Sequence, residues 1–150
     1  LRGPQIVMGY YNDPEATARV FRAGWFYPGD LGNLGADGLL RVIGRLEDTI
    51  QQGDRLMSPT PLEEALRDVP GVRDVAVFGM RASAGGQEIC AALVLDTHCD
   101  AQTVRAAVAA RLGAQAPARL FLMDRLPRNA NGKVIRRELI ARVQQGGLGS

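Results

Sequence analysis

Apolar and polar positions in residues 1–43 predict a helix and a small antiparallel sheet. Asp13 followed by a proline and an acidic residue predicts a helix start, and the helix is expected to stop before Gly24. A short aromatic strand follows it. Asp37-Gly38 is typical of a hairpin turn, with 39–43 as the second strand of that hairpin. This segment contains too few apolar positions to form a core by itself.

The hairpin strand ends in Gly44-Arg45-Leu46-Glu47-Asp48, where three charged residues follow a glycine. Such a composition is typical of a solvent-exposed turn. The alternative is a joint between two bodies, whose charges pair differently in different arrangements, and on the residues alone the turn is favoured. After this stretch the pattern predicts a second hairpin over 49–57.

From residue 60 onward the pattern predicts helix, strand, strand, helix, strand, which is an α+β layer of helices over a three-stranded sheet. The expected strands cover 72–78, 88–95 and 120–123, and 88–95 is expected to be central because its apolar run is nearly unbroken. Thr60 with Glu63 predicts a capping box for the first helix. The helices present apolar faces at helical spacing: Leu62, Ala65, Leu66 and Val69 in the first, and Val104, Ala107, Val108 and Leu112 in the second.

The composition of residues 127–133 is typical of a loop, and a last helix follows it. Its apolar positions are Ile135, Leu139, Ile140 and Val143. The neighbouring charged residues, Arg136, Arg137 and Glu138, are expected to face solvent.

Composition and charge narrow the class of protein. A hydrophobic fraction of 46% is enough for a core, and a net charge of +2 is too small to indicate binding to nucleic acid or an anionic membrane. No apolar run reaches the length of a membrane span, and two cysteines without metal spacing favour a cytoplasmic setting. With one histidine in the chain, we expect neither a metal site nor a Ser-His triad. Leu1 is not a methionine, so we expect the chain to be a piece of a longer protein.

Lys133 is the only lysine among eighteen basic residues, and the others are all arginines. A general bias toward arginine explains the many arginines but not the single lysine. An ammonium group is a compact charge on a flexible stem, which a guanidinium cannot replace where one small cation must reach one oxygen. A surface lysine in a loop is the alternative.

Four stretches in register carry a resemblance to a known family: Gly9-Tyr10-Tyr11-Asn12 with Asp13-Pro14-Glu15-Ala16-Thr17; Gly24-Trp25-Phe26 with Gly29-Asp30-Leu31-Gly32; Gly44-Arg45 with Asp48; and Pro127-Arg128 with Asn131-Gly132-Lys133-Val134 and Arg136-Arg137-Glu138-Leu139. Together they resemble the C-terminal part of the adenylate-forming superfamily, which comprises acyl-CoA synthetases, peptide-synthetase adenylation domains and luciferases. The resemblance covers nearly the whole chain.

The resemblance implies roles for three residues. Asp30 would accept hydrogen bonds from the ribose hydroxyls of ATP, since a carboxylate is a pure acceptor. Arg45 would reach a ribose or phosphate oxygen. Lys133 would be catalytic and would stabilise the negative charge that builds on the α-phosphate during adenylation. On the residues alone, Asp30 could instead lie in a glycine turn, and Arg45 could pair with Glu47 or Asp48.

The resemblance also gives the joint a meaning. Residues 1–43 would end the large N-terminal AMP-binding lobe, and 44–148 would be a mobile lobe that rotates about a hinge at Glu47 and Asp48. Gly53 and Asp54 would lie in the loop that faces the active site during thioester formation. Gly149 and Ser150 are interpreted as residues left from cloning.

Three positions depart from the family pattern. Pro28 replaces a usual threonine, Asp54 replaces a glycine, and Pro61 replaces a glutamate common in the family. A carboxylate at position 54 would be bulkier and would repel phosphates, so the departures bear on the reaction with CoA more than on adenylation.

The function implied is that of an acyl-CoA synthetase, which uses ATP, Mg²⁺ and CoA to convert a small carboxylic acid into an acyl-adenylate and then a thioester. Its partner would be its own N-terminal lobe, and exposed strand edges could pair two copies of this piece. We expect the piece alone to be inactive. The alternatives are an adenylation domain that loads a carrier-protein phosphopantetheine, and a non-catalytic interaction module derived from the family.

Overall fold

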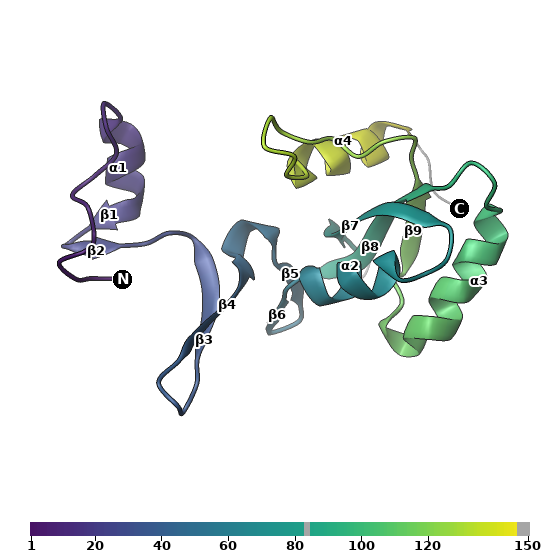
Figure 1. Ribbon diagram of the computed structural model, residues 1–150, viewed down its shortest axis with the longest axis horizontal. Coiled ribbons are helices and arrows are strands. Elements are labelled where there is room, and N and C mark those ends of the chain that lie inside the picture. The colour runs from purple at the N-terminus through teal and green to yellow at the C-terminus, as the bar shows by residue number, and fades with distance from the viewer. Residues whose placement is uncertain (83–84, 147–150) are drawn as a thin grey trace. The chain divides into compact units, whose positions relative to one another are not determined.

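The computed structural model describes residues 1–82 and 85–146 and divides into two compact units, Leu1–Glu47 and Asp48–Ser150 (Figure 1). Sequence analysis put the boundary before Gly44. The division falls later because Gly44 and Arg45 still pair with the neighbouring strand of the first unit, so the chain leaves that unit only after Glu47.

The first unit contains the predicted helix, and its antiparallel strands form two separate pairs where the sequence predicted one small sheet. Its elements are α1 (Pro14–Val20), β1 (Phe21–Arg22), β2 (Trp25–Phe26), β3 (Asp30–Leu34) and β4 (Leu40–Arg45). Asp13 caps α1, and its carboxylate accepts a hydrogen bond of 2.8 Å from the backbone N–H of Ala16. In the β3–β4 turn, the Arg41 side chain and the Leu39 N–H both bind Asp37, which holds the pKa of that carboxyl below its usual value.

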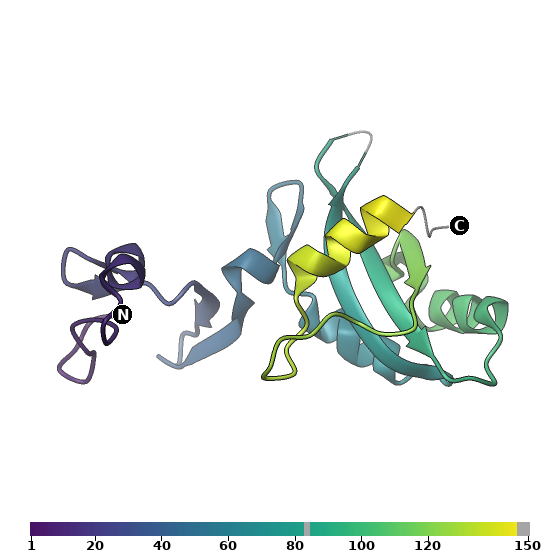
Figure 2. The same ribbon diagram turned by 90° about the horizontal axis from the view of Figure 1, so that it is seen from above.

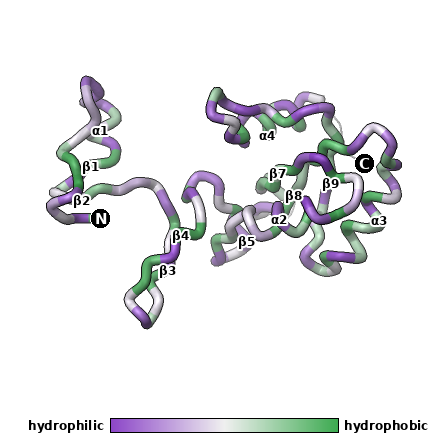
Figure 3. Tube along the Cα trace, in the orientation of Figure 1, coloured by the Kyte–Doolittle hydropathy of each residue, from purple (hydrophilic) through white to green (hydrophobic). Residues whose placement is uncertain are grey.

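None of residues 1–47 is buried, so the first unit has no core of its own. Apolar segments of β3 and β4 are nevertheless clear in the hydropathy colouring (Figure 3). Large side chains there stay in contact with solvent: Leu34 is 68% exposed and Val42 is 66% exposed. This agrees with the expectation that residues 1–43 cannot form a core alone.

The second unit is built on a three-stranded sheet of β7 (Val72–Arg81), β8 (Gln87–Leu95) and β9 (Arg119–Leu122). The central strand is β8, as its apolar sequence predicted; it pairs antiparallel with β7 and parallel with β9. A parallel pair needs a crossover connection, and α3 (Ala101–Leu112) lies in that connection between β8 and β9. The α+β prediction is therefore confirmed.

Side chains alternate along the strands and form two buried layers, one on each face of the sheet. The layer under α2 (Thr60–Arg67) and α3 contains Leu62, Leu66, Val69, Val75, Val77, Ala91, Leu93, Val104 and Val108. The layer under α4 (Arg136–Gly146) contains Ala76, Phe78, Cys90, Ala92, Val94, Phe121, Leu139 and Val143. Figure 2 shows α4 crossing the face of the sheet opposite to that covered by α2 and α3. Within the described ranges, every helix is too short or too polar to cross a bilayer.

The predicted second hairpin is present and belongs to the second unit. It consists of β5 (Ile50–Gln52) and β6 (Arg55–Met57), and it follows a short 3₁₀ turn, η1 (Leu46–Asp48). Ile50 is 1% exposed and joins the core layer under α2, while the Gln51 N–H donates to Gln87 Oε1 at 2.8 Å. The hairpin is thus fixed to the sheet at its base.

The two helices α3 and α2 differ in how their N-termini are capped. Asp100 caps α3 by accepting from the Thr103 N–H and hydroxyl, and these bonds hold the pKa of Asp100 below its usual value. The capping box predicted for Thr60 and Glu63 is wrong, because neither side chain caps α2. Ser58 Oγ accepts from the Thr60 N–H instead, at 3.3 Å, and Glu63 is turned toward the sheet.

We predict that Leu66→Ala lowers the free energy of unfolding by about 2–5 kcal/mol, because it removes a side chain from a fully buried position and leaves a cavity. Urea denaturation followed by circular dichroism measures the change. Leu56→Ala is the matched control, since Leu56 is 49% exposed and its loss is expected to cost about 1 kcal/mol or less. Equal losses for the two variants would contradict the assignment of the core.

Candidate functional site

The loop that carries Lys133 is held in shape by hydrogen bonds between Asn129 and the backbone of the loop. Asn129 Oδ1 accepts from the N–H groups of Asn131 and Lys133, at 3.0 and 2.9 Å. The Asn129 N–H donates to the carbonyl oxygen of Lys133 at 2.9 Å, which closes the loop. Gly132 has φ of +78°, a conformation that favours glycine. None of these contacts uses the Lys133 side chain.

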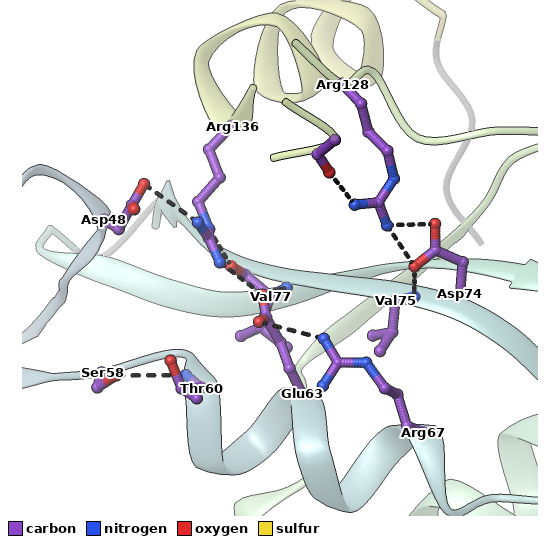
Figure 4. A network of polar contacts seen from close by, with 11 residues as sticks. Asp48, Ser58, Thr60, Glu63, Arg67, Asp74, Val75, Val77, Arg128 and Arg136 are labelled. Carbon is purple, nitrogen blue, oxygen red and sulfur yellow. Dashed lines mark hydrogen bonds and ion pairs between the residues drawn. The ribbon is translucent and has the colours of Figure 1, made fainter. Parts of the chain in front are cut away.

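Arg128 fixes this loop to the edge of the sheet. One guanidinium nitrogen, Nη2, donates to both carboxylate oxygens of Asp74 on β7, at 2.8 and 2.7 Å. The other, Nη1, donates to the Gly132 carbonyl within the loop. Figure 4 shows this pairing beside the contacts of Arg136 with Asp48 and Glu63. Sequence analysis did not assign a role to Arg128 or Asn129, although Asn-x-x-Gly is typical of a turn closed by a side chain.

Lys133 projects from the loop with its side chain 51% exposed, and Nζ lies 3.3 Å from Asp48 Oδ2. The predicted catalytic lysine and one predicted hinge residue are therefore brought together within the second unit. Glu47, the other predicted hinge residue, is exposed and has no partner among residues 1–82 and 85–146.

Arg136 at the start of α4 is the residue that sequence reasoning placed wrongly. It was expected to face solvent, but its side chain is only 15% exposed and contacts two carboxylates. Nη1 lies 3.1 Å from Asp48 Oδ1 and Nη2 lies 2.6 Å from Glu63 Oε1, as Figure 4 shows. The signal was available, because position 136 has helical spacing to the inner residues Leu139 and Val143.

Glu63 and Arg136 together satisfy the backbone of an edge strand. The Val77 N–H on β7 donates to Glu63 Oε1 at 2.9 Å, and the Val77 carbonyl accepts from Arg136 Nε at 3.1 Å. These backbone groups would otherwise be left unpaired beside the core. In the part of the chain that the structure describes, every buried side-chain nitrogen and oxygen has a hydrogen-bond partner.

Asp30 and Arg45, the two predicted nucleotide contacts, face each other across β3 and β4 in the first unit. Arg45 Nε lies 3.2 Å from Asp30 Oδ1, and Arg45 Nη1 donates to the Pro28 carbonyl at 2.6 Å. Asp30 begins β3, directly after Gly29, and the partner of Arg45 is Asp30 and not Glu47 or Asp48.

The Asp30 carboxylate remains accessible. Its side chain is 34% exposed, and the residue lines a hollow of about 490 Å³ whose walls include Tyr27, Leu31 and Val42. An acceptor beside aromatic and apolar walls can receive the hydroxyls of a sugar while a flat ring packs against the walls.

Gly53 and Asp54 form the tip of the β5–β6 hairpin, and both are exposed. Gly53 has φ of +57° and lines a hollow of about 400 Å³ with Gln51, Arg81, Gly86 and Gln87. Among the described residues, no three acidic, cysteine or histidine side chains come together in a group that could hold a metal ion.

Comparison with known proteins supplies the family. The model of the AMP-binding enzyme C-terminal domain matches residues 61–133. The 2-succinylbenzoate–CoA ligase of Geobacillus kaustophilus strain HTA426 is 39% identical over 142 residues, which are 93% of this chain and 29% of the relative.

Solved structures agree with this match. An o-succinylbenzoate CoA synthetase from Bacillus subtilis, in complex with its acyl-adenylate intermediate, superposes with a TM-score of 0.76 at 34% identity, over 92% of this chain and 29% of that one. An amide bond synthetase from Marinactinospora thermotolerans gives a TM-score of 0.71 at 32% identity, over 93% of this chain and 29% of that one. The sequence of residues 61–133 is that of the AMP-binding enzyme C-terminal domain, and the fold agrees with it. The chain belongs to the adenylate-forming superfamily and corresponds to the C-terminal portion of its members. It spans less than a third of the length of these relatives.

We predict that Arg136→Met lowers the free energy of unfolding by about 3–5 kcal/mol, because two largely buried carboxylates lose their most buried cation and are left with the half-exposed Lys133 and Arg67. Thermal and urea unfolding measure the loss. Arg111→Met is the matched control: Arg111 pairs with Asp68 at 2.7 Å on the surface, where one ion pair contributes about 1 kcal/mol or less. A cost for Arg136→Met as small as the control would mean that the cluster does not stabilise the unit.

Proposed function

We propose that this chain is the C-terminal part of an ATP-dependent acyl-CoA synthetase. The whole enzyme would join a carboxylic acid to AMP with release of pyrophosphate, and the CoA thiol would then displace AMP to give a thioester. The observation that carries the proposal is the single lysine on an exposed, internally braced loop, in a chain whose curated relatives are named CoA ligases.

Lys133 is proposed to be the catalytic cation. An ammonium held near the α-phosphate offsets the negative charge that develops as the carboxylate attacks. The geometry supports this role because the loop backbone is fixed by Asn129 and Arg128, while the lysine side chain is 51% exposed and pairs with Asp48 alone among the described residues. A loop with a fixed backbone and a flexible lysine side chain can present a charge without a change in the fold of the lobe.

Asp30 and Arg45 are proposed to bind the nucleotide. Asp30 Oδ1 is paired with Arg45, and the Asp30 side chain is 34% exposed. The carboxylate can therefore accept ribose hydroxyls while Arg45 keeps it oriented and ionised. Arg45 is itself 48% exposed, which leaves donors available for a phosphate or ribose oxygen.

The same proposal assigns the hinge to Glu47 and Asp48 and the thioester-forming loop to Gly53 and Asp54. Support comes from the division of the chain between Glu47 and Asp48 and from the exposed tip of the β5–β6 hairpin. CoA would approach that tip. Mg²⁺ would accompany ATP as its counter-ion, and the large N-terminal lobe would supply the rest of the site.

We predict that Lys133→Ala, made in the full-length protein, lowers the rate of adenylation by about 10²-fold or more, since an electrostatic contact made in the transition state is lost. Exchange of labelled pyrophosphate into ATP measures it, with aromatic, dicarboxylic and long-chain acids as candidate substrates. Arg137→Ala is the matched control: it removes an exposed positive charge from the start of α4 and should leave the rate unchanged.

Full exchange by the Lys133→Ala variant would contradict the proposal and favour a non-catalytic module. Unfolding measurements on the variant separate a loss of chemistry from a loss of fold. Because Lys133 makes only an exposed ion pair, its replacement is expected to cost about 1 kcal/mol or less in stability.

A further inference from the structure

The carboxylate of Asp48 is shared between two cations. Its Oδ1 lies 3.1 Å from Arg136 Nη1, and its Oδ2 lies 3.3 Å from Lys133 Nζ. The Asp48 side chain is only 16% exposed, so the shared group is largely screened from water. It belongs to the first residue of the second unit, and both cations belong to the last part of that unit.

The two contacts differ in how firmly they are held. Arg136 is 15% exposed and also binds Glu63 and the Val77 carbonyl, so its position is fixed by three partners. Lys133 is 51% exposed, and Asp48 is its one side-chain partner among the described residues. A flexible side chain held by one half-exposed ion pair is released at low cost, whereas a buried guanidinium with several partners is not.

We propose that Asp48 is a positioning residue that holds the Lys133 ammonium in a resting place on the second unit, and that Arg136 keeps the Asp48 carboxylate in position when the lysine leaves. When it moves, the Lys133 ammonium exchanges one anionic partner for another. It leaves the Asp48 carboxylate and meets an oxygen of the substrate. The catalytic meaning of this exchange rests on the proposed function, whereas the holding of Lys133 by Asp48 does not.

The test measures how readily Lys133 reacts with an amine-directed N-hydroxysuccinimide ester in the full-length protein without substrate. Mass spectrometry follows the peptide that contains Lys133, which is the only lysine of residues 1–150. Asp48→Asn keeps an oxygen that can accept from Arg136 but removes the charge that holds the ammonium. We expect labelling of Lys133 to become about threefold faster, as for release from an ion pair of this exposure.

Asp68→Asn is the matched control, because it removes an equivalent charge from the same unit at a carboxylate that pairs with Arg111. Its labelling rate should equal that of the unaltered protein. Asp48→Glu keeps the charge and should label more slowly than Asp48→Asn. Circular dichroism confirms that each variant is folded before labelling.

Ionic strength gives a second measurement that needs no substitution. Salt at about 1 M screens exposed charges and should speed labelling of the unaltered protein toward the rate of Asp48→Asn, whose own rate should change little. Equal labelling of Asp48→Asn and the unaltered protein, or an equal increase in Asp68→Asn, would overturn the proposal. Since labelling requires no turnover, this result is independent of the pyrophosphate exchange that tests the function.

Discussion

The contact on which the second unit depends is the one between the Arg136 guanidinium and its surroundings. A charge that is 15% exposed is stable only when its donors are matched by acceptors, and here two carboxylates and one backbone carbonyl provide them. These partners come from η1, α2 and β7, while Arg136 itself begins α4. One side chain therefore ties together four segments that are distant in the sequence, and it does so at the edge of the sheet, where β7 has no further strand to pair with.

This arrangement separates what is rigid in the site from what can move. The backbone of the Lys133 loop is closed by Asn129 and fixed to β7 by Arg128 and Asp74. The lysine side chain has none of these constraints and extends beyond the loop to a single carboxylate. An enzyme that must bring a charge to its substrate gains from a fixed support, since less conformational freedom is lost when the charge arrives.

Patterns that depend on neighbouring residues were predicted well from the sequence. The apolar runs of 72–78 and 88–95 identified β7 and β8 and the central position of β8, and Asp13 identified the start of α1. The failures involve contacts between distant residues. Glu63 has the spacing of a capping residue, but a core-facing carboxylate is worth more when it satisfies the Val77 N–H and Arg136, which is 73 residues away. Arg136 itself was misplaced because its charge was given more weight than its helical spacing.

The site residues inferred from resemblance, Asp30, Arg45 and Lys133, have positions compatible with their proposed roles, but no physical argument from the sequence could have supplied their partners. The pairing of Lys133 with Asp48 joins residues 85 positions apart and needs the folded unit to be seen. The composition of 44–48 favoured a turn, and only the family resemblance suggested a joint there. The point of division after Glu47 follows from the length of β4, which no local pattern determined.

The bracing of the Lys133 loop by backbone groups has an evolutionary consequence. Because Asn129, Arg128 and Gly132 set the shape of the loop without help from the lysine side chain, a single codon change at position 133 would remove the charge and leave the lobe intact. Under the role proposed for Lys133, descendants of such a gene would keep a well-folded unit for other uses while losing the proposed chemistry. On that proposal, the fold and the reactivity can be inherited separately at this position.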